Sequence, residues 1–309
     1  MKYSVRKSVT IDAPQAKIRA LIEDFNQWNR WSPWTIAEPD CPIEIRGEPG
    51  VIGHSMMWDG EIIGSGRNTL NSVAANEIAY DLAFFKPWKS EAEASFQFEE
   101  SGGQTKVTWC LSSSMPWFLF FMIKTMKNWI GMDYERGLRM LKALAETGEI
   151  NAKTTNNGLV EYQGFSYVGL KRSVAMDEVA SAMQEDFDTM VKLVVIEHQT
   201  AARHWVTIYP KFDMRNLRAT YIAAVSDENL RDKNLDQKFI RGQIPTGKML
   251  EVKHDGPYDF LGNAWAMGMM TMRAKKYKGA KYPFEQYWNS PLEEAPENLR
   301  TSVYFPIKG

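Results

Sequence analysis

The expected fold of the first half of the chain rests on residues 91–111, EAEASFQFEESGGQTKVTWCL. Apolar and polar residues alternate on both sides of Gly102-Gly103, and the apolar ones are Ala92, Ala94, Phe96, Phe98, Val107, Trp109 and Leu111. Alternation of period two is typical of strands that bury one face. A Gly-Gly pair between two such runs favours a tight hairpin turn. The stretch therefore predicts two antiparallel strands joined by a turn.

A long amphipathic helix is expected after this hairpin. Its apolar stripe has helical spacing and consists of Tyr134, Leu138, Leu141 and Ala145. At the other end of this half, Tyr3–Ile11 alternates like a strand, and Pro14 opens a short helical segment that runs to about Trp31. We therefore expect residues 1–148 to form one antiparallel sheet that wraps a long C-terminal helix.

A repeat is the main feature of the second half. The polar stretch after the long helix, rich in Asn, Thr and Gly, predicts a linker at residues 149–159 and a second domain at 160–309. Within that domain, residues 162–225 and 247–307 both favour the order strand, helix, strand, strand. The sequence thus predicts an α+β protein whose second domain is a duplicated β-α-β-β module.

The first half resembles a known superfamily. Ile11-Asp12-Ala13-Pro14, the aromatic run from Phe25 to Trp34 (FNQWNRWSPW) and the phrase from Gly53 to Gly66 are similar to START-like (SRPBCC) proteins of the polyketide cyclase/dehydrase branch. The resemblance implies a helix-grip fold, with an apolar cavity between the sheet and the C-terminal helix. It does not imply a particular reaction, because members range from lipid carriers to cyclases to chaperone activators.

The second half resembles another family. Val252–Tyr258 (VKHDGPY), Phe284–Pro291 (FEQYWNSP) and Leu299–Ile307 (LRTSVYFPI) are similar to GyrI-like small-molecule-binding domains. That family includes the effector-binding domains of AraC-type and MerR-type multidrug regulators, stand-alone binders and some hydrolases. The resemblance implies a cleft lined by aromatic side chains around one buried glutamate, and the matching residue is Glu285.

Glu285 is the centre of the predicted site. Side chains two apart on a strand share a face, so Glu285 and Tyr287 point together. The other predicted ligand-binding residues are Trp265, Tyr209, Tyr221 and Tyr304. A carboxylate among aromatic faces suits a hydrophobic and especially a cationic organic ligand. From its spacing alone, Glu285 also fits a solvated glutamate on an edge strand.

The sequence is compatible with two further functions. Burial would raise the pKa of Glu285, which would suit it as the general acid or base of a small-molecule hydrolase or cyclase. Alternatively, the second domain regulates a protein partner such as DNA gyrase, which would require an exposed apolar surface on it.

The overall charge argues against nucleic acid and anionic lipid as the main partner. The chain has 37 Lys and Arg against 38 Asp and Glu, a net charge of -1. The START-like half also stands where regulators of the second family have a helix-turn-helix, so we expect no direct nucleic-acid binding. The four histidines form no metal-binding pattern, and no nucleotide-binding motif is present, so neither metal nor cofactor is expected.

The remaining features predict a reduced, cytoplasmic protein. Cys41 and Cys110 form no CxxC pair, and the N-terminus lacks a secretory signal. The longest apolar run, Met115–Ile123, is shorter than the roughly 18 residues of a membrane span. It fits an interfacial membrane anchor, or a gate or core segment at the start of the long helix, and the second interpretation is favoured because an exposed patch promotes aggregation.

Overall fold

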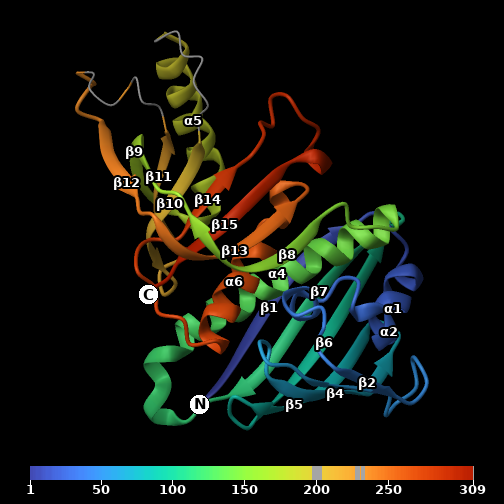
Figure 1. Cartoon of the computed structure of the whole chain (residues 1–309). Coiled ribbons are helices and arrows are strands. Elements are labelled where there is room, and N and C mark those ends of the chain that lie inside the picture. Colours follow the sequence, from blue (N-terminus) through green and yellow to red (C-terminus); the bar gives the residue numbers. More distant parts are fainter. Residues whose placement is uncertain (197–203, 227–229, 231–233, 309) are drawn as a thin grey trace. The chain divides into compact units, whose positions relative to one another are not determined.

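The computed structural model describes residues 1–196, 204–226, 230 and 234–308 (Figure 1). The chain folds into two compact units, Met1–Asn151 and Ala152–Gly309. Each unit contains one antiparallel sheet accompanied by helices, which confirms the predicted α+β class.

The first unit has a seven-stranded sheet with the order β1-β7-β6-β5-β4-β3-β2. Its strands are β1 (Lys2–Ile11), β2 (Ile43–Arg46), β3 (Ser55–Asp59), β4 (Ser65–Ala74), β5 (Glu77–Lys86), β6 (Ser90–Ser101) and β7 (Gln104–Ser114). Its helices are α1 (Gln15–Glu23), α2 (Phe25–Trp28), α3 (Pro33–Ala37), the 3-10 helix η1 (Trp117–Met122) and α4 (Ile123–Thr147). The sheet wraps α4, so the helix-grip prediction is confirmed (Figure 1).

The predicted hairpin is formed by β6 and β7. Ser101 pairs with Gln104, and the two glycines between them have φ values of 61° and 83°. Both values lie in the left-handed region, which glycine enters without a Cβ penalty. Two such residues in a two-residue loop match the right-handed twist of the flanking strands.

Aromatic side chains fill much of the space between α4 and the sheet. Trp109 of β7 stacks on Tyr134 of α4, with ring centroids 4.0 Å apart, and on Phe96 of β6, with centroids 4.8 Å apart. Trp28 and Trp31 are buried against the same rings. These two tryptophans therefore belong to the core.

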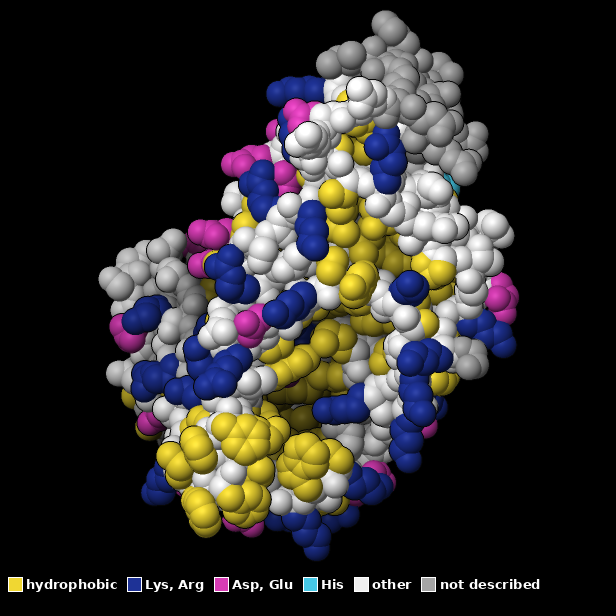
Figure 2. Space-filling model, turned by 90° about the vertical axis from the view of Figure 1, so that its left-hand side faces the viewer, with side chains coloured by type: hydrophobic (Ala, Val, Ile, Leu, Met, Phe, Trp, Pro, Cys, Tyr) yellow, Lys and Arg dark blue, Asp and Glu magenta, His cyan; other side chains and the backbone are white. Residues whose placement is uncertain are grey.

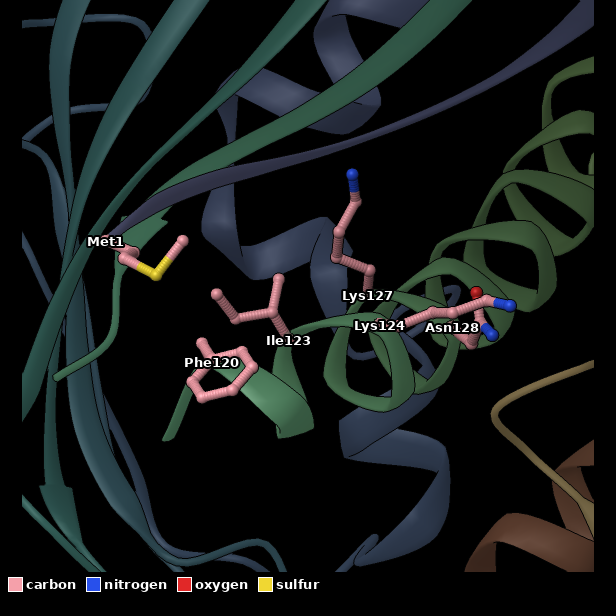
Figure 3. Close-up of a pocket in the computed structure, with 6 residues that line it drawn as sticks. All are labelled: Met1, Phe120, Ile123, Lys124, Lys127 and Asn128. Atoms are coloured by element: carbon pink, nitrogen blue, oxygen red, sulfur yellow. The ribbon is translucent and has the colours of Figure 1, made fainter. Parts of the chain in front are cut away.

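A hollow of about 510 Å³ lies where α4 begins. It is lined by Met1, Phe120, Ile123, Lys124, Lys127 and Asn128, so apolar and basic side chains both contribute (Figure 3). The START-like resemblance led us to expect an apolar cavity in this unit. The hollow lies beside the N-terminal end of α4, which the aromatic core does not cover.

The second unit has an eight-stranded sheet with the order β12-β9-β11-β10-β14-β15-β13-β8. Its strands are β8 (Lys153–Tyr162), β9 (Phe165–Ala175), β10 (Trp205–Asp213), β11 (Arg218–Val225), β12 (Phe239–Ile244), β13 (Gly247–Asp255), β14 (Phe284–Tyr287) and β15 (Arg300–Pro306). Its helices are α5 (Val179–Ile196), α6 (Gly262–Ala274) and the 3-10 helices η2 (Met176–Glu178), η4 (Tyr258–Phe260) and η5 (Pro296–Asn298).

The predicted duplication is confirmed. The first copy is β9-α5-β10-β11 and the second is β13-α6-β14-β15. In the sheet, β10 and β14 are neighbours, and each copy continues outward with its last strand and then its first strand. The two copies are thus related by an approximate twofold axis between β10 and β14, and β12 and β8 extend the two edges.

Part of the predicted linker at 149–159 is a strand. Lys153–Tyr162 forms β8, which pairs along its length with β13 at the edge of the second sheet. An edge strand has one neighbour and keeps many side chains in water, so its composition can be as polar as that of a linker. The Asn- and Thr-rich sequence of β8 therefore resembles that of a linker.

Within the described ranges, no helix has the combination of length and hydropathy that a membrane span requires. Nor do they contain a group of three or more His, Cys, Asp or Glu side chains arranged to hold a metal ion. His198, one of the four histidines considered in the sequence, lies outside the described residues.

Candidate functional site

Glu285 lies at the centre of the second sheet, in the short strand β14 beside the approximate twofold axis. It is directly opposite Thr207 of β10 on one side and Val303 of β15 on the other. Its side chain lies on the face covered by α5 and α6, because it contacts Trp265 of α6. The solvated edge-strand interpretation of Glu285 is therefore wrong, since β14 has neighbours on both sides.

The Glu285 carboxylate is buried and receives hydrogen bonds on both oxygens. Its residue is 3% exposed. The indole Nε1 of Trp265 donates to Oε1 at 2.5 Å, and the phenol of Tyr287 donates to Oε2 at 2.5 Å. The same phenol oxygen lies 3.0 Å from Thr207 Oγ1. Glu285 and Tyr287 therefore form one polar wall, as period-two geometry requires.

Burial raises the pKa of Glu285, because the charged carboxylate loses its hydration. The hydrogen bonds from Tyr287 and Trp265 and the nearby Tyr209 phenol act in the opposite direction, because they stabilise the charged form. Burial raises the pKa of the Tyr287 and Tyr209 phenols, and the nearby carboxylate raises it further. The phenols thus stay protonated, and Tyr287 remains a donor to the carboxylate.

Aromatic rings surround this polar wall. Tyr209 of β10 meets Trp265 edge to face, with ring centroids 4.9 Å apart. Tyr287 is flanked by Phe187 of α5 at 5.6 Å and by Tyr258 of η4 at 5.7 Å. Phe187 and Tyr258 were not among the predicted site residues. Neither shares a strand with Glu285, so alternation along the sequence gives no signal for them.

Tyr221 lies near this group, yet its hydroxyl is directed elsewhere. It packs in the same apolar cluster as Tyr209, and its phenol donates to Oδ2 of Asp186 at 2.7 Å. The other oxygen of Asp186 accepts a hydrogen bond from Arg172 at 2.6 Å. Tyr221 therefore contributes a ring to the cluster, while its polar end belongs to the ion-pair network of Asp186 and Arg172.

Tyr304 lies outside the Glu285 site, so the prediction that it binds ligand together with Glu285 is wrong. It is directly opposite Phe284, the neighbour of Glu285, and its ring stacks on Phe284 with centroids 5.1 Å apart. Because adjacent residues of a strand point to opposite faces, Tyr304 and Glu285 lie on different sides of the sheet. The phenol of Tyr304 donates to Oε1 of Glu251 at 2.8 Å.

A hollow of about 410 Å³ adjoins the Glu285 site. Phe212, Met269, Met272 and Phe305 give it apolar walls, and Arg273 and Lys281 also line it. Trp265 is a lining residue of this hollow as well, whereas Glu285 is not. The indole of Trp265 therefore lies between the hollow and the carboxylate.

Two buried polar residues near Tyr287, Thr301 and His254, are not among the predicted site residues. Thr301 is directly opposite Tyr287 on one side and His254 on the other, so the three side chains form one row on the α-helical face. His254 Nε2 lies 2.9 Å from the carbonyl of Pro257 and hence bears the proton. Among the described residues, His254 Nδ1 and Thr301 Oγ1 have no hydrogen-bond partner. They provide an acceptor and a hydroxyl next to the polar wall.

Three solved structures illustrate what the chain is similar to. The Aha1 dimer from Colwellia psychrerythraea is 21% identical, covers 48% of this chain and 99% of its own, and gives a TM-score of 0.37. The C-terminal domain of EcmrR is 18% identical, covers 52% and 99%, and gives 0.38. EcmrR in its DNA complex is 18% identical, covers 62% and 68%, and gives 0.41. No curated protein matches the chain.

Two family models match successive parts of the chain. Residues 2–146 match the family described as polyketide cyclase / dehydrase and lipid transport. Residues 197–308 match the GyrI-like small molecule binding domain. The chain therefore joins a domain of the polyketide cyclase/dehydrase type to a GyrI-like domain, which confirms both resemblances. Small-molecule binding is the general function that the two families indicate.

Proposed function

We propose that the second unit binds hydrophobic organic cations, with Glu285 as the counter-charge. The observation that supports this most directly is the lack of a cationic partner. Within the described residues, Trp265 and Tyr287 donate hydrogen bonds to the Glu285 carboxylate, and both groups are neutral. A buried carboxylate is costly unless it is paired with a positive charge. A cationic ligand would supply that charge.

The rings around the carboxylate favour the same ligand class. A desolvated organic cation gains about 0.5 to 2 kcal/mol from each aromatic face that it contacts. Trp265, Tyr209 and Tyr287 all lie within contact of Glu285 or of one another. Such a site selects for charge and apolar area more than for exact shape, so we expect it to accept several lipophilic cations.

The neighbouring hollow suits the apolar part of such a ligand. Its volume of about 410 Å³ is in the range of small-molecule pockets. Arg273 and Lys281 line it, so the positive charge of a ligand is repelled from the hollow and attracted to Glu285. Rotation of the Trp265 side chain would connect the two spaces. We therefore expect the apolar body in the hollow and the cationic group at the carboxylate.

The test compares two carboxylates of the same sheet. Glu285→Gln removes the charge in the proposed site, and Glu251→Gln removes a charge that also accepts tyrosine and serine hydrogen bonds but lies on the opposite face. Binding of tetraphenylphosphonium and of an uncharged aromatic compound of similar size is measured by calorimetry with the full chain. We expect Glu285→Gln to weaken cation binding about 30-fold or more, as for loss of one partner of a buried charge pair.

The matched variant makes the result decisive. Glu251→Gln is expected to bind the cation like the wild type, and the uncharged compound is expected to bind both variants nearly equally. Equal cation binding by wild type and Glu285→Gln would contradict the assignment of the site. Equal losses in both variants would show that general charge, and not this carboxylate, attracts the ligand.

A second candidate function is acid/base catalysis on a bound small molecule, by hydrolysis or cyclisation. It is favoured by the raised pKa of Glu285 together with the unpartnered His254 Nδ1 and Thr301 Oγ1, which could hold a water molecule next to Tyr287. The test incubates the full chain with reactive cyclopropanoid compounds and follows product by chromatography. Turnover that Glu285→Gln abolishes would support acid/base catalysis by Glu285. Binding without product would contradict catalysis and agree with a binding function alone.

A further inference from the structure

The first unit exposes large apolar side chains at one end of its sheet. The turn between β5 and β6 and the segment after β7 lie at the same end, because Ala92 of β6 pairs with Ser113 of β7. The exposed fractions are 42% for Phe85, 64% for Trp88, 75% for Trp117, 57% for Phe118, 61% for Phe120 and 56% for Phe121. We call residues 85–89 and η1 (Trp117–Met122) the aromatic tip. The core interpretation of this apolar run is therefore wrong.

The rings of η1 are exposed on more than one side. In a 3-10 helix, residues three apart are aligned, so Trp117 lies above Phe120 and Phe118 lies above Phe121. Each of these four rings is more than half exposed. A protein partner usually covers one side of a helix, whereas fluid hydrocarbon surrounds an inserted segment. The distribution of the rings therefore favours a lipid surface over a second protein.

Local charge favours a bilayer that contains anionic lipid. Residues 84–91 and 115–130 contain four lysines and a single acidic residue, Glu91. Lys86 forms an ion pair with Asp59 at 2.8 Å. Lys89, Lys124 and Lys127 add to the positive charge beside the rings, and Figure 2 shows Lys and Arg side chains next to the hydrophobic group at the lower end of the molecule. The net charge of -1 conceals this local excess.

We propose that the aromatic tip inserts into the interfacial layer of a bilayer that contains anionic lipid. Tryptophan concentrates at that layer, where its ring contacts the acyl boundary and its N–H stays hydrated. Lysines beside it lie at the level of the headgroups and are attracted by their negative charge. The contact is peripheral, because a few side chains enter the membrane and the backbone does not cross it.

The hollow of the first unit adjoins the aromatic tip. Phe120 belongs to the tip and also lines the hollow of about 510 Å³, together with Ile123 of α4 (Figure 3). Insertion of the tip would bring one wall of the hollow to the membrane surface. A hydrophobic molecule dissolved in the bilayer would then have a short path into the hollow.

The test is vesicle sedimentation with the full chain. Vesicles of equal parts phosphatidylglycerol and phosphatidylcholine are compared with vesicles of phosphatidylcholine alone, at one low salt concentration. We expect the wild type to sediment with the anionic vesicles. Trp117→Ser/Phe121→Ser should weaken this binding about tenfold or more, because two inserted rings are lost. Lys89→Glu/Lys127→Glu should weaken binding to the anionic vesicles and leave the weak binding to neutral ones unchanged.

A matched control lies at the other end of the same sheet. Val51 and Ile52, which precede β3, are 52% and 67% exposed. The opposite end of β3 lies toward the aromatic tip, because Asp59 pairs with Ser65 and Ser65 pairs with Lys86. Val51→Ser/Ile52→Ser should bind vesicles like the wild type. Undiminished sedimentation of Trp117→Ser/Phe121→Ser would overturn the proposal. The proposal would also be overturned if the wild type bound neither kind of vesicle and instead formed a dimer that these two substitutions dissociate.

Discussion

The indole Nε1 of Trp265 and Oε1 of Glu285 are joined by a hydrogen bond of 2.5 Å, and the same indole is a wall of the hollow beside α6. One side chain thus links the helix of the second repeat to the carboxylate at the centre of the sheet. The position of α6 therefore determines both the environment of the charge and its separation from the hollow.

Replacement of Trp265 should reveal this link. Trp265→Phe keeps an aromatic ring but removes the donor to Glu285, so the folded state should lose about 1.5 to 3 kcal/mol at neutral pH, as for a hydrogen bond to a charged group. Trp288→Phe is the matched variant, because the Trp288 indole donates to the neutral hydroxyl of Ser302. Urea unfolding should show the larger loss for Trp265→Phe, and similar losses would contradict the role of the carboxylate charge.

Tyr287 and Tyr304 should differ in their effect on ligand binding. Tyr287→Phe removes a donor to Glu285, so cation binding should change several-fold, whereas Tyr304→Phe removes a donor to Glu251 on the opposite face. The second variant should cost about 1.5 to 3 kcal/mol of stability, as for loss of a hydrogen bond to a charged group, and leave the dissociation constant within about twofold. A large effect of Tyr304→Phe on cation binding would mean that the ligand contacts the other face of the sheet.

Gly268 allows α6 to approach β15 closely. A Cβ at this position would lie 2.1 Å from Cε2 of Phe305. Alanine is about 1 kcal/mol better than glycine in a helix interior, yet overpacking costs about 1 to 3 kcal/mol, so Gly268→Ala should destabilise the protein. Gly279→Ala places its Cβ in open space and serves as the control. Thermal unfolding that shows Gly268→Ala to be more stable than wild type would contradict this packing argument.

Much of the fold follows from periodicity in the sequence. The alternation around Gly102-Gly103 predicts a hairpin that the structure contains, and the repeated order of elements predicts the duplicated module. Polar composition was a poorer guide at β8, where edge exposure resembles a linker. The rings of η1 are exposed although the sequence favours a gate or core segment there, because sequence alone does not show whether an apolar run has a partner.

The candidate site was only partly predictable, for a geometric reason. Alternation within one strand places Glu285 and Tyr287 together, but the relation between strands depends on register. Tyr304 is directly opposite Phe284 and not Glu285, so it points to the other face. Thr301 and His254 join the row of Tyr287 through the same register. Only the folded structure specifies these pairings.

The central claim is that an ionised Glu285 attracts a cation, and the pH dependence of binding tests it most directly. Burial raises the pKa of Glu285, so the carboxyl is protonated and neutral below that raised value and charged above it. Affinity for a permanent cation such as tetraphenylphosphonium should therefore rise with pH through the raised pKa and level off above it. The affinity of Glu285→Gln should stay low and flat across the same range. A wild-type affinity that does not change with pH, or a Glu285→Gln variant that retains the wild-type rise, would contradict the account.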